Sequence, residues 1–232
     1  MNRLFLVRHG ENVANLTKEF SHRLVDHSLT DKGREQARQT AAYFADRSID
    51  AIYASPLLRA KETADLIGQG CNLPVAVVEG FRELNVGDLE RQPPSAETWG
   101  VHRDVVRAWI AGDLDRSFPG GEDYHQLWGR YIAGLEQVLA GRDDQNIVIV
   151  AHGGIFVFTL PRLCPDVSTD WLRTQPNENA CITEVEVHRR DGKLIGELVR
   201  WASTDHLSGD ATDFVPGIPD AETLRRWQND AG

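Results

Sequence analysis

The chain contains few cysteines and no long apolar run. Its three cysteines, Cys71, Cys164 and Cys181, are odd in number and far apart, and no C-x-x-C pair occurs among its 232 residues. This spacing argues against a disulfide framework and against a zinc knuckle, so we expect three buried, reduced thiols. No segment is long and apolar enough to span a bilayer, so we expect no membrane partner.

We also expect no signal peptide. Arg8, His9 and Glu11 interrupt the only early apolar run. A secretory signal needs a longer uncharged core. We therefore expect a cytoplasmic protein.

The sequence has no excess of positive charge. Lysine and arginine number 25 against 35 aspartates and glutamates, which gives a net charge of −10. Nucleic acid is therefore not the expected partner. An anionic ligand would need arginines that converge on one pocket against this acidic background.

Strands and helices alternate along the sequence. Apolar runs and helical spacing predict the strands 3–7, 50–54, 74–78, 146–151, 180–187 and 194–201, and the helices 31–46, 55–68, 95–110, 122–139 and 154–163. The alternation implies an α/β fold, a three-layer α/β/α sandwich with a mostly parallel mixed sheet.

We expect one catalytic domain over residues 1–202. The segment 203–232 is rich in Asp, Gly and Pro. It is expected to be a C-terminal tail of the same domain, or one that packs loosely over its surface.

Charged residues follow three of the predicted strands. Arg8 and His9 end the first strand, Arg59 lies in the helix after the second, and His152 with Gly153 follows the central strand. Because parallel strands deliver their carboxyl ends to one sheet edge, these side chains should meet there. An arginine fork suits a phosphate, and a neutral imidazole is a nucleophile, so the group indicates phosphoryl transfer.

A leaving alkoxide would need a proton. Glu83 follows the third predicted strand, at the same edge of the sheet, and a carboxylic acid can supply that proton. Any one of these residues alone would more often be a solvated charge, and it is their joint placement that favours a site.

The motifs as a set resemble the histidine phosphatase superfamily, the phosphoglycerate mutase-like proteins. The matching stretches, in family order, are 7–11 (VRHGE), Asn15, 29–33 (LTDKG), 36–37, 55–57 with 59–60 and 63–64, 82–84 (REL), 119–122 (PGGE), 150–154 (VAHGG) and 176–183.

The resemblance implies a role for each matching residue. His9 would be phosphorylated, Arg8, Arg59 and His152 would bind the phosphoryl group, and Glu83 would be the proton donor. Asn15 and Ser21 match positions that contact phosphate or substrate, and we expect the same of Gly153. No metal and no cofactor are implied.

Three functions remain open. The first is a metal-independent, acid-type phosphomonoester hydrolase acting on a small phosphorylated metabolite. The second is a phosphoglycerate mutase, although Glu83 is followed by Leu84-Asn85-Val86 instead of the mutase branch's Glu-Arg-His-Tyr segment. The third is a non-catalytic module that binds a phosphorylated ligand. For the oligomeric state, the candidate that we consider is a homodimer.

Several basic residues stand in loops that would border the pocket. His22 and Arg23, which we expect to bind substrate, are joined by His27, Arg82 and Arg91. We expect this cluster to favour a substrate with a second anionic group, although solvated loop charges would give the same pattern. Trp99, Trp109 and Trp128 are expected to pack helices and not to stack on a ligand.

Overall fold

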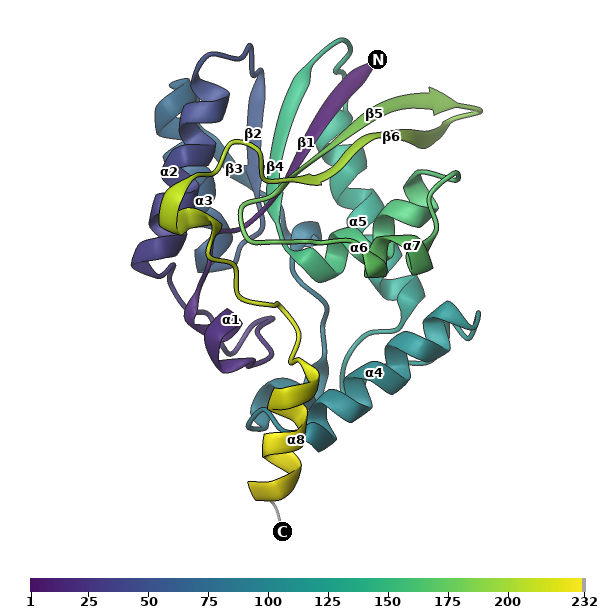
Figure 1. The fold of residues 1–232 in the computed structure, drawn as a ribbon. Helices are drawn as coiled ribbons and strands as arrows, with labels where there is room; N and C mark the ends of the chain where they lie inside the picture. Colours follow the sequence, from purple (N-terminus) through teal and green to yellow (C-terminus); the bar gives the residue numbers. More distant parts are fainter. Residues whose placement is uncertain (231–232) are drawn as a thin grey trace.

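A six-stranded sheet runs through the centre of the computed structural model, which describes residues 1–230 (Figure 1). Its strand order is β3-β2-β4-β1-β5-β6. The strands are β1 (Asn2–Arg8), β2 (Ala51–Ala54), β3 (Val75–Val77), β4 (Asn146–Ala151), β5 (Ile182–Arg190) and β6 (Lys193–Ser203). The first four in the order pair in parallel, and β5 and β6 are antiparallel. The mostly parallel mixed sheet is as predicted.

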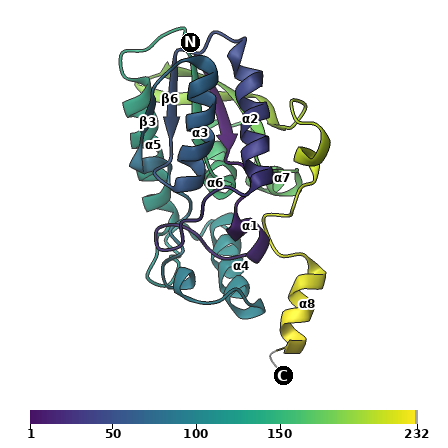
Figure 2. The ribbon, with the colours of Figure 1, turned by 90° about the vertical axis from the view of Figure 1, so that its left-hand side faces the viewer.

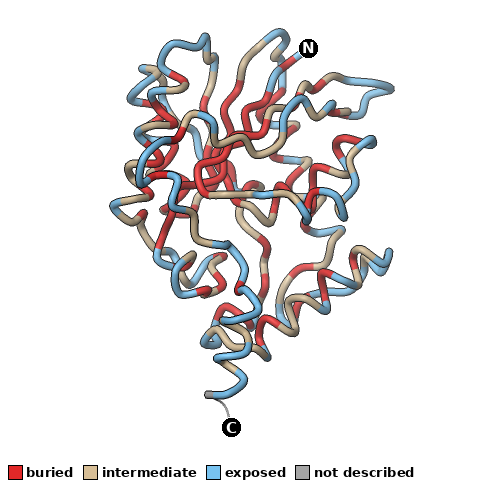
Figure 3. The backbone as a smooth tube through the Cα atoms, in the orientation of Figure 1, coloured by how far each residue is buried: buried red, intermediate tan, exposed pale blue. Residues whose placement is uncertain are grey.

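Successive side chains of the central strands enter opposite halves of the core. In β1, Leu4 and Leu6 join one buried cluster, whereas Phe5 and Val7 join the other. Strand β4 alternates in the same way, and both strands are buried along nearly their whole length (Figure 3). A strand buried on both faces needs helices on both faces.

Helices supply those two outer layers. The pair α2 (Asp31–Ala45) and α3 (Leu58–Cys71) covers one face of the sheet, and α5 (Tyr124–Leu139) and α6 (Gly153–Leu163) cover the other (Figure 2). This confirms the three-layer sandwich. Thr30 accepts a hydrogen bond from Gly33 N and so caps α2.

Helix α3 begins later than predicted. The sequence predicted a helix from residue 55, but Ser55, Pro56 and Leu57 form a turn before it. The Ser55 hydroxyl contacts both Leu57 N, at 3.4 Å, and the His152 ring. Side chain–backbone bonds of this kind compete with helix formation. The turn places Ser55 beside the end of β4.

Two glycines let the end of β1 approach the start of α2. A Cβ on Gly10 would lie 2.4 Å from the Gly33 carbonyl oxygen, and one on Gly33 would lie 2.0 Å from that of Glu11. No side chain fits at either position without moving the backbone. The segment after His9 is therefore held against α2 by direct backbone packing.

Further elements lie beyond the carboxyl edge of the parallel strands. They are α1 (Val13–Thr17), α4 (Ala96–Ile110), α7 (Thr169–Thr174) and the 3₁₀ turns η1 (Glu79–Phe81) and η2 (Gly87–Arg91). Helices α1 and α7 were not predicted, because five or six residues are too few to show a helical period. Helix α4 matches the predicted helix 95–110, with Ser95 as its N-cap.

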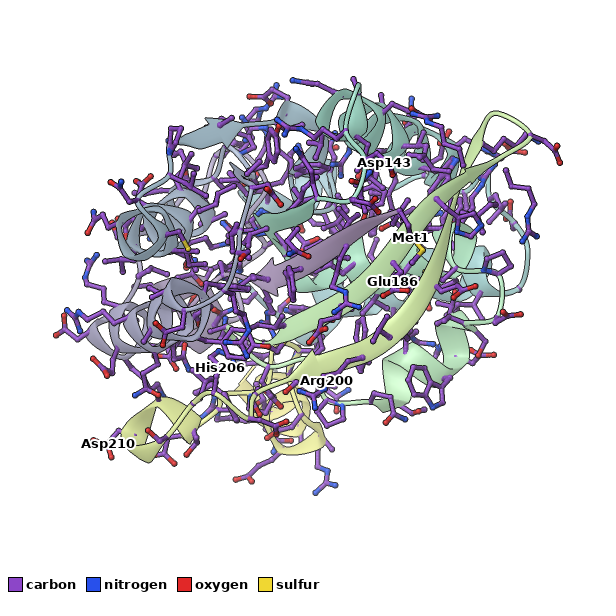
Figure 4. The ribbon with its side chains drawn as sticks, turned by 90° about the horizontal axis from the view of Figure 1, so that it is seen from above. Met1, Asp143, Glu186, Arg200, His206 and Asp210 are labelled. Carbon is purple, nitrogen blue, oxygen red and sulfur yellow. The ribbon has the colours of Figure 1, made fainter. Side chains whose placement is uncertain are left out.

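Part of the C-terminal segment is packed against the rest of the fold. Leu207 and Ala211 are buried, the latter in the 3₁₀ turn η3 (Gly209–Thr212). His206 Nε2 lies 3.0 Å from Thr40 Oγ1 of α2, and Figure 4 shows this histidine on the stretch that leads from β6 to η3. The last helix, α8 (Ala221–Asp230), rests on α4 and extends below the sandwich. The segment thus runs along α2 and then across the site edge.

Within residues 1–230, no helix combines the length and the hydropathy needed to cross a membrane. Cys71, Cys164 and Cys181 are all free, with the last two buried and Cys71 half-buried.

Candidate active site

Four charged or polar side chains meet at the carboxyl ends of β1, β2 and β4. Arg8 ends β1 and His9 follows it, Arg59 lies in the first turn of α3, and His152 caps α6. Their exposed fractions are 6%, 3%, 3% and 0%, respectively. The parallel topology therefore brings together the four residues that the sequence placed at strand ends.

His9 is held in one tautomer. Its Nδ1 lies 2.7 Å from the Gly10 carbonyl oxygen, which can only accept a hydrogen bond. Nδ1 must therefore carry the proton, and Nε2 carries the lone pair. Arg59 Nε donates to that lone pair at 3.0 Å.

The surroundings keep His9 neutral. Burial lowers the pKa of His9 well below its usual value, and the positive charges of Arg59 and Arg8 lower it further. The hydrogen bond to Gly10 opposes this shift without reversing it. A neutral imidazole with a fixed lone pair is the form that attacks an electrophile.

Arg59 is oriented from a second side by the loop before α2. It donates to the Ser21 hydroxyl at 2.8 Å and to the Ser21 carbonyl at 2.9 Å. Burial lowers the pKa of Arg59 to about 10, which leaves the guanidinium charged at neutral pH. Arg8 is also charged and buried. It donates to the Asn177 carbonyl, and its Nε has no partner within the described residues.

His152 faces His9, with ring centroids 5.2 Å apart. Its Nε2 lies 2.7 Å from Ser55 Oγ, whereas its Nδ1 is buried without a partner in the described part of the chain. Burial, followed by the charge of Arg59, lowers the pKa of His152 well below its usual value. An unpartnered buried ring nitrogen beside the nucleophile is suited to contacting a bound oxygen.

The Glu83 carboxylate lies against the start of α6. It accepts hydrogen bonds from the backbone N–H groups of Gly154 at 2.9 Å and Ile155 at 2.8 Å. A Cβ on Gly154 would lie 2.6 Å from Glu83 Oε1, so a larger residue would displace the carboxylate. The acid is thus fixed at the same edge as the histidines.

An ion pair that the sequence analysis missed holds the Glu83 segment. Arg130 of α5 makes a two-pronged contact with Glu122, at 2.9 and 2.8 Å. The same guanidinium donates to the carbonyls of Gly80, Arg82 and Glu83 at 2.9, 2.7 and 2.9 Å. Nothing local marks Arg130, since helix arginines are common, although PGGE at 119–122 pointed to Glu122.

A second missed residue, Asn179, ties α1 to His9. Its amide nitrogen donates to the His9 carbonyl and to Asn15 Oδ1, both at 3.0 Å. Asn15 and Ser21 both line the cavity, as does Gly153. The structure therefore brings these three to the site.

The loop residues His22 and Arg23 are not brought into the cavity. The His22 ring is buried with Nδ1 2.8 Å from the Glu83 carbonyl, and the Arg23 side chain is exposed. The cause is Glu90, whose Oε1 accepts four consecutive backbone N–H groups of residues 22–25 at 2.7–3.0 Å. These bonds outweigh the effect of burial and lower the pKa of Glu90. They turn the loop away from the cavity.

The other members of the predicted basic cluster are also absent from the cavity lining. His27 pairs with Glu19, Arg82 pairs with Glu79, and Arg91 is exposed. The predicted second-anion cluster therefore does not exist as a group. It was wrong because the loop's direction depends on a carboxylate more than sixty residues away.

The cavity at this edge has a volume of about 520 Å³. One end holds the Arg8, His9, Arg59 and Glu83 group, and the rest is mainly apolar. The tail supplies part of the wall, through residues 216–219 and Leu224. Lys18 fastens the tail, with Nζ 2.6 Å from both the Asn15 and Pro216 carbonyl oxygens.

The three tryptophans that were expected to pack helices lie in two kinds of environment. Trp109 and Trp128 pack among helices, as expected. Trp99 is buried but also lines the cavity, so helix packing is not its only contact.

Across residues 1–230 there is no cluster of three or more His, Cys, Asp or Glu side chains arranged to hold a metal.

Known proteins resemble this chain over most of its length. The model of the histidine phosphatase superfamily (branch 1) matches residues 4–201. The uncharacterized phosphatase PhoE of Bacillus subtilis is 31% identical, covering 90% of this chain and 98% of that protein. The probable phosphoglycerate mutase GpmB of Salmonella choleraesuis is also 31% identical, covering 92% and 98%.

Solved structures share the fold of this chain. A mycobacterial glucosyl-3-phosphoglycerate phosphatase superposes with a TM-score of 0.72 at 26% identity, covering 87% of this chain and 99% of that one. The α-ribazole phosphatase of Shigella flexneri gives a TM-score of 0.67 at 27% identity, covering 87% and 96%.

Proposed function

The chain belongs to branch 1 of the histidine phosphatase superfamily, and from its site we propose that it is a phosphomonoester hydrolase acting through a phosphohistidine at His9. The observation that carries this proposal is the fixed tautomer of His9. The Gly10 carbonyl holds the Nδ1 proton, which leaves the Nε2 lone pair for attack on phosphorus.

In the first step, His9 Nε2 attacks the phosphorus atom and the P–O ester bond breaks. The leaving alkoxide takes a proton from the Glu83 carboxyl group. Arg59 Nε now donates to the attacking lone pair, so a bound phosphoryl group must draw that donor onto its own oxygens. Arg8 and Arg59 would then offset the charge that develops on the equatorial oxygens.

His152 would contribute a hydrogen bond through its unpartnered Nδ1. As the first residue of α6, Gly153 has an N–H with no acceptor inside the helix, so it can also serve the phosphoryl oxygens.

In the second step, a water molecule attacks the phosphohistidine. Glu83, now a carboxylate, takes the water proton, the N–P bond breaks and its electron pair returns to Nε2. Phosphate leaves and His9 is regenerated. Atoms and charge balance with water as the only co-reactant.

We propose that no metal or organic cofactor is required. The buried guanidinium groups supply the positive charge that a metal would otherwise provide, and His9 is itself the nucleophile. The low pKa of His9 also favours activity below neutral pH, as an acid-type enzyme would show. Three free cysteines support a cytoplasmic location, where thiols stay reduced.

The first test replaces the nucleophile. We expect His9→Ala to retain less than about 0.1% of the kcat/KM for p-nitrophenyl phosphate, given the cost of deleting a nucleophile. His125→Ala, at an exposed position, is the matched control and should keep full activity. Undiminished turnover by His9→Ala would overturn the assignment.

A second test separates the hydrolase from the mutase, which a relative's name raises. Incubation with 3-phosphoglycerate should release free phosphate if the substrate is accepted. Formation of 2-phosphoglycerate would instead identify a mutase. No turnover of any phosphomonoester, with no phosphohistidine, would indicate a binding module.

A further inference from the structure

The cavity continues from the phosphoryl end along an apolar wall. Phe20 and Trp99 pack with ring centroids 4.5 Å apart, and Val106, Phe158 and Leu224 line the same space. These side chains offer no polar partner to a substrate. Whatever part of a substrate lies here is therefore apolar.

His102 stands within this wall and stays uncharged. Its ring stacks on Phe20 and lies 5.1 Å from Trp99. Burial lowers the pKa of His102 to about 4, with help from the charges of Arg103 and Arg173. At neutral pH the wall therefore carries no charge of its own.

Two arginines from separate helices line the cavity beside this wall. Arg103 lies on α4 and Arg173 on α7, elements that Figure 1 shows on different parts of the carboxyl edge. Among residues 1–230, neither guanidinium has a hydrogen bond or an ion pair with another side chain. Arg103 is half-buried and Arg173 is exposed, and the charges of both lower the pKa of His102 in the wall.

The acidic residues of the cavity do not neutralise this pair. Glu19 Oε2 already accepts from Thr17 at 2.7 Å and faces His27 at 3.2 Å. The negative charge of Glu178 raises the pKa of Arg8, which belongs to the phosphoryl end. Glu83 is bonded to α6. Two cationic groups therefore border the cavity without a carboxylate partner.

We propose that Arg103 and Arg173 form a second anion subsite, and that the preferred substrates are phosphomonoesters whose apolar spacer carries a second anionic group. This rests on the proposed hydrolase activity. The phosphoryl group would sit between Arg8 and Arg59, the spacer along Phe20 and Trp99, and the second anion between Arg103 and Arg173. These two residues set specificity and take no part in the chemistry.

The test uses a series of ω-(phosphonooxy)alkanoates of increasing chain length, each paired with its neutral methyl ester. The wild-type enzyme should show a ratio of acid to ester kcat/KM that peaks at one chain length. The Arg103→Gln/Arg173→Gln double variant should lose roughly 10-fold in kcat/KM for the best acid, the size expected of two charge-assisted contacts. Its activity on the ester should stay within about 2-fold, because the ester offers no charge to these groups.

The matched control is Arg107→Gln. Arg107 lies on the same helix, is exposed and faces Asp104 at 3.8 Å, outside the cavity. It should leave the acid-to-ester ratio unchanged. Higher salt should lower the wild-type ratio and leave that of the double variant nearly constant.

An acid-to-ester ratio that is the same in wild type and double variant, at every chain length, would overturn the subsite while the hydrolase function stands. If the wild type hydrolyses no substrate, calorimetry can test the subsite independently of turnover. It would measure binding of each acid and its methyl ester to the inactive His9→Ala protein. Tighter binding of acid than ester, lost with the two arginines, supports the subsite without the hydrolase. Equal binding overturns the subsite.

Discussion

Arg130 is the residue whose removal should most clearly separate placement of the acid from the chemistry itself. It makes five hydrogen bonds, two to Glu122 and three to the carbonyls of the segment that carries Glu83. The side chains of Arg130 and Glu122 are 22% and 6% exposed, so this is a mostly buried pair. Arg130→Met would leave the Glu122 carboxylate buried with no countercharge.

Breaking one side of a buried pair costs about 3–5 kcal/mol, and we expect a loss of unfolding free energy in that range. The Glu83 segment would also lose three anchors, and a shift of about 1 Å in a catalytic group costs about 100-fold in rate. Urea unfolding and kcat/KM for p-nitrophenyl phosphate measure the two effects on the same preparation. Arg189→Met, which breaks an exposed pair with Glu136, is the control and should cost less than about 1 kcal/mol.

The double variant Arg130→Met/Glu122→Gln divides the two effects. Removing the orphaned charge should restore part of the lost stability, whereas activity should stay low because the carbonyls of Gly80, Arg82 and Glu83 remain without their donor. A stability loss below about 1 kcal/mol together with unchanged kcat/KM in Arg130→Met would refute the reasoning.

The remaining predictions concern titration and loop placement. Because burial and two arginines hold the pKa of His9 well below its usual value, its ring NMR signals should titrate well below pH 6.5, and a midpoint near 6.5 would contradict this. The pKa of His102 is about 4 in the folded state and about 6.5 in the unfolded state, so this histidine destabilises the fold as pH falls from about 6.5 to about 4. His102→Phe should therefore reduce the acid-induced loss of unfolding free energy by about 2–3 kcal/mol. An unchanged dependence of unfolding free energy on pH would refute this. Glu90→Gln leaves four backbone donors with a weaker acceptor, so it should lower the unfolding free energy measured in urea by about 1–3 kcal/mol. It should also lower kcat/KM, because Ser21 would be displaced. An unchanged unfolding free energy together with an unchanged kcat/KM would refute this.

The features predicted from sequence were those with a local signal. The β4 run NIVIVA and the continuous apolar run of β1 predicted buried strands of a mostly parallel sheet, and the fold confirms them. Residues at strand ends follow from topology alone, so Arg8, Arg59 and His152 could be assigned to one edge before any coordinates. The superfamily resemblance and the phosphatase reading agree with the matching family model and relatives.

Features that depend on distant partners could not be predicted. Arg23 was expected at the pocket, but its loop is turned by Glu90, which lies 67 residues further along the chain. Arg103 and Arg173 have no local sequence signal, because nothing in their neighbours shows that they border a cavity. Arg130 was missed for the same reason.

The tail shows a third limit. Its Asp, Gly and Pro content left open whether it belongs to the packed domain or lies loosely on the surface, and it did not show that Leu207 and Ala211 would be buried or that Pro216 would accept a bond from Lys18. Composition averages over a segment, whereas packing depends on a few positions within it.

The account depends most on a phosphoryl group carried by His9. Rapid acid-free quenching during turnover of a ³²P-labelled phosphomonoester, followed by peptide mass spectrometry, measures this directly. We predict an acid-labile, base-stable phosphoryl group on Nε2 of His9, formed within one turnover and absent from His9→Ala. Full turnover with no phosphohistidine, or with the label on His152 instead, would contradict the account.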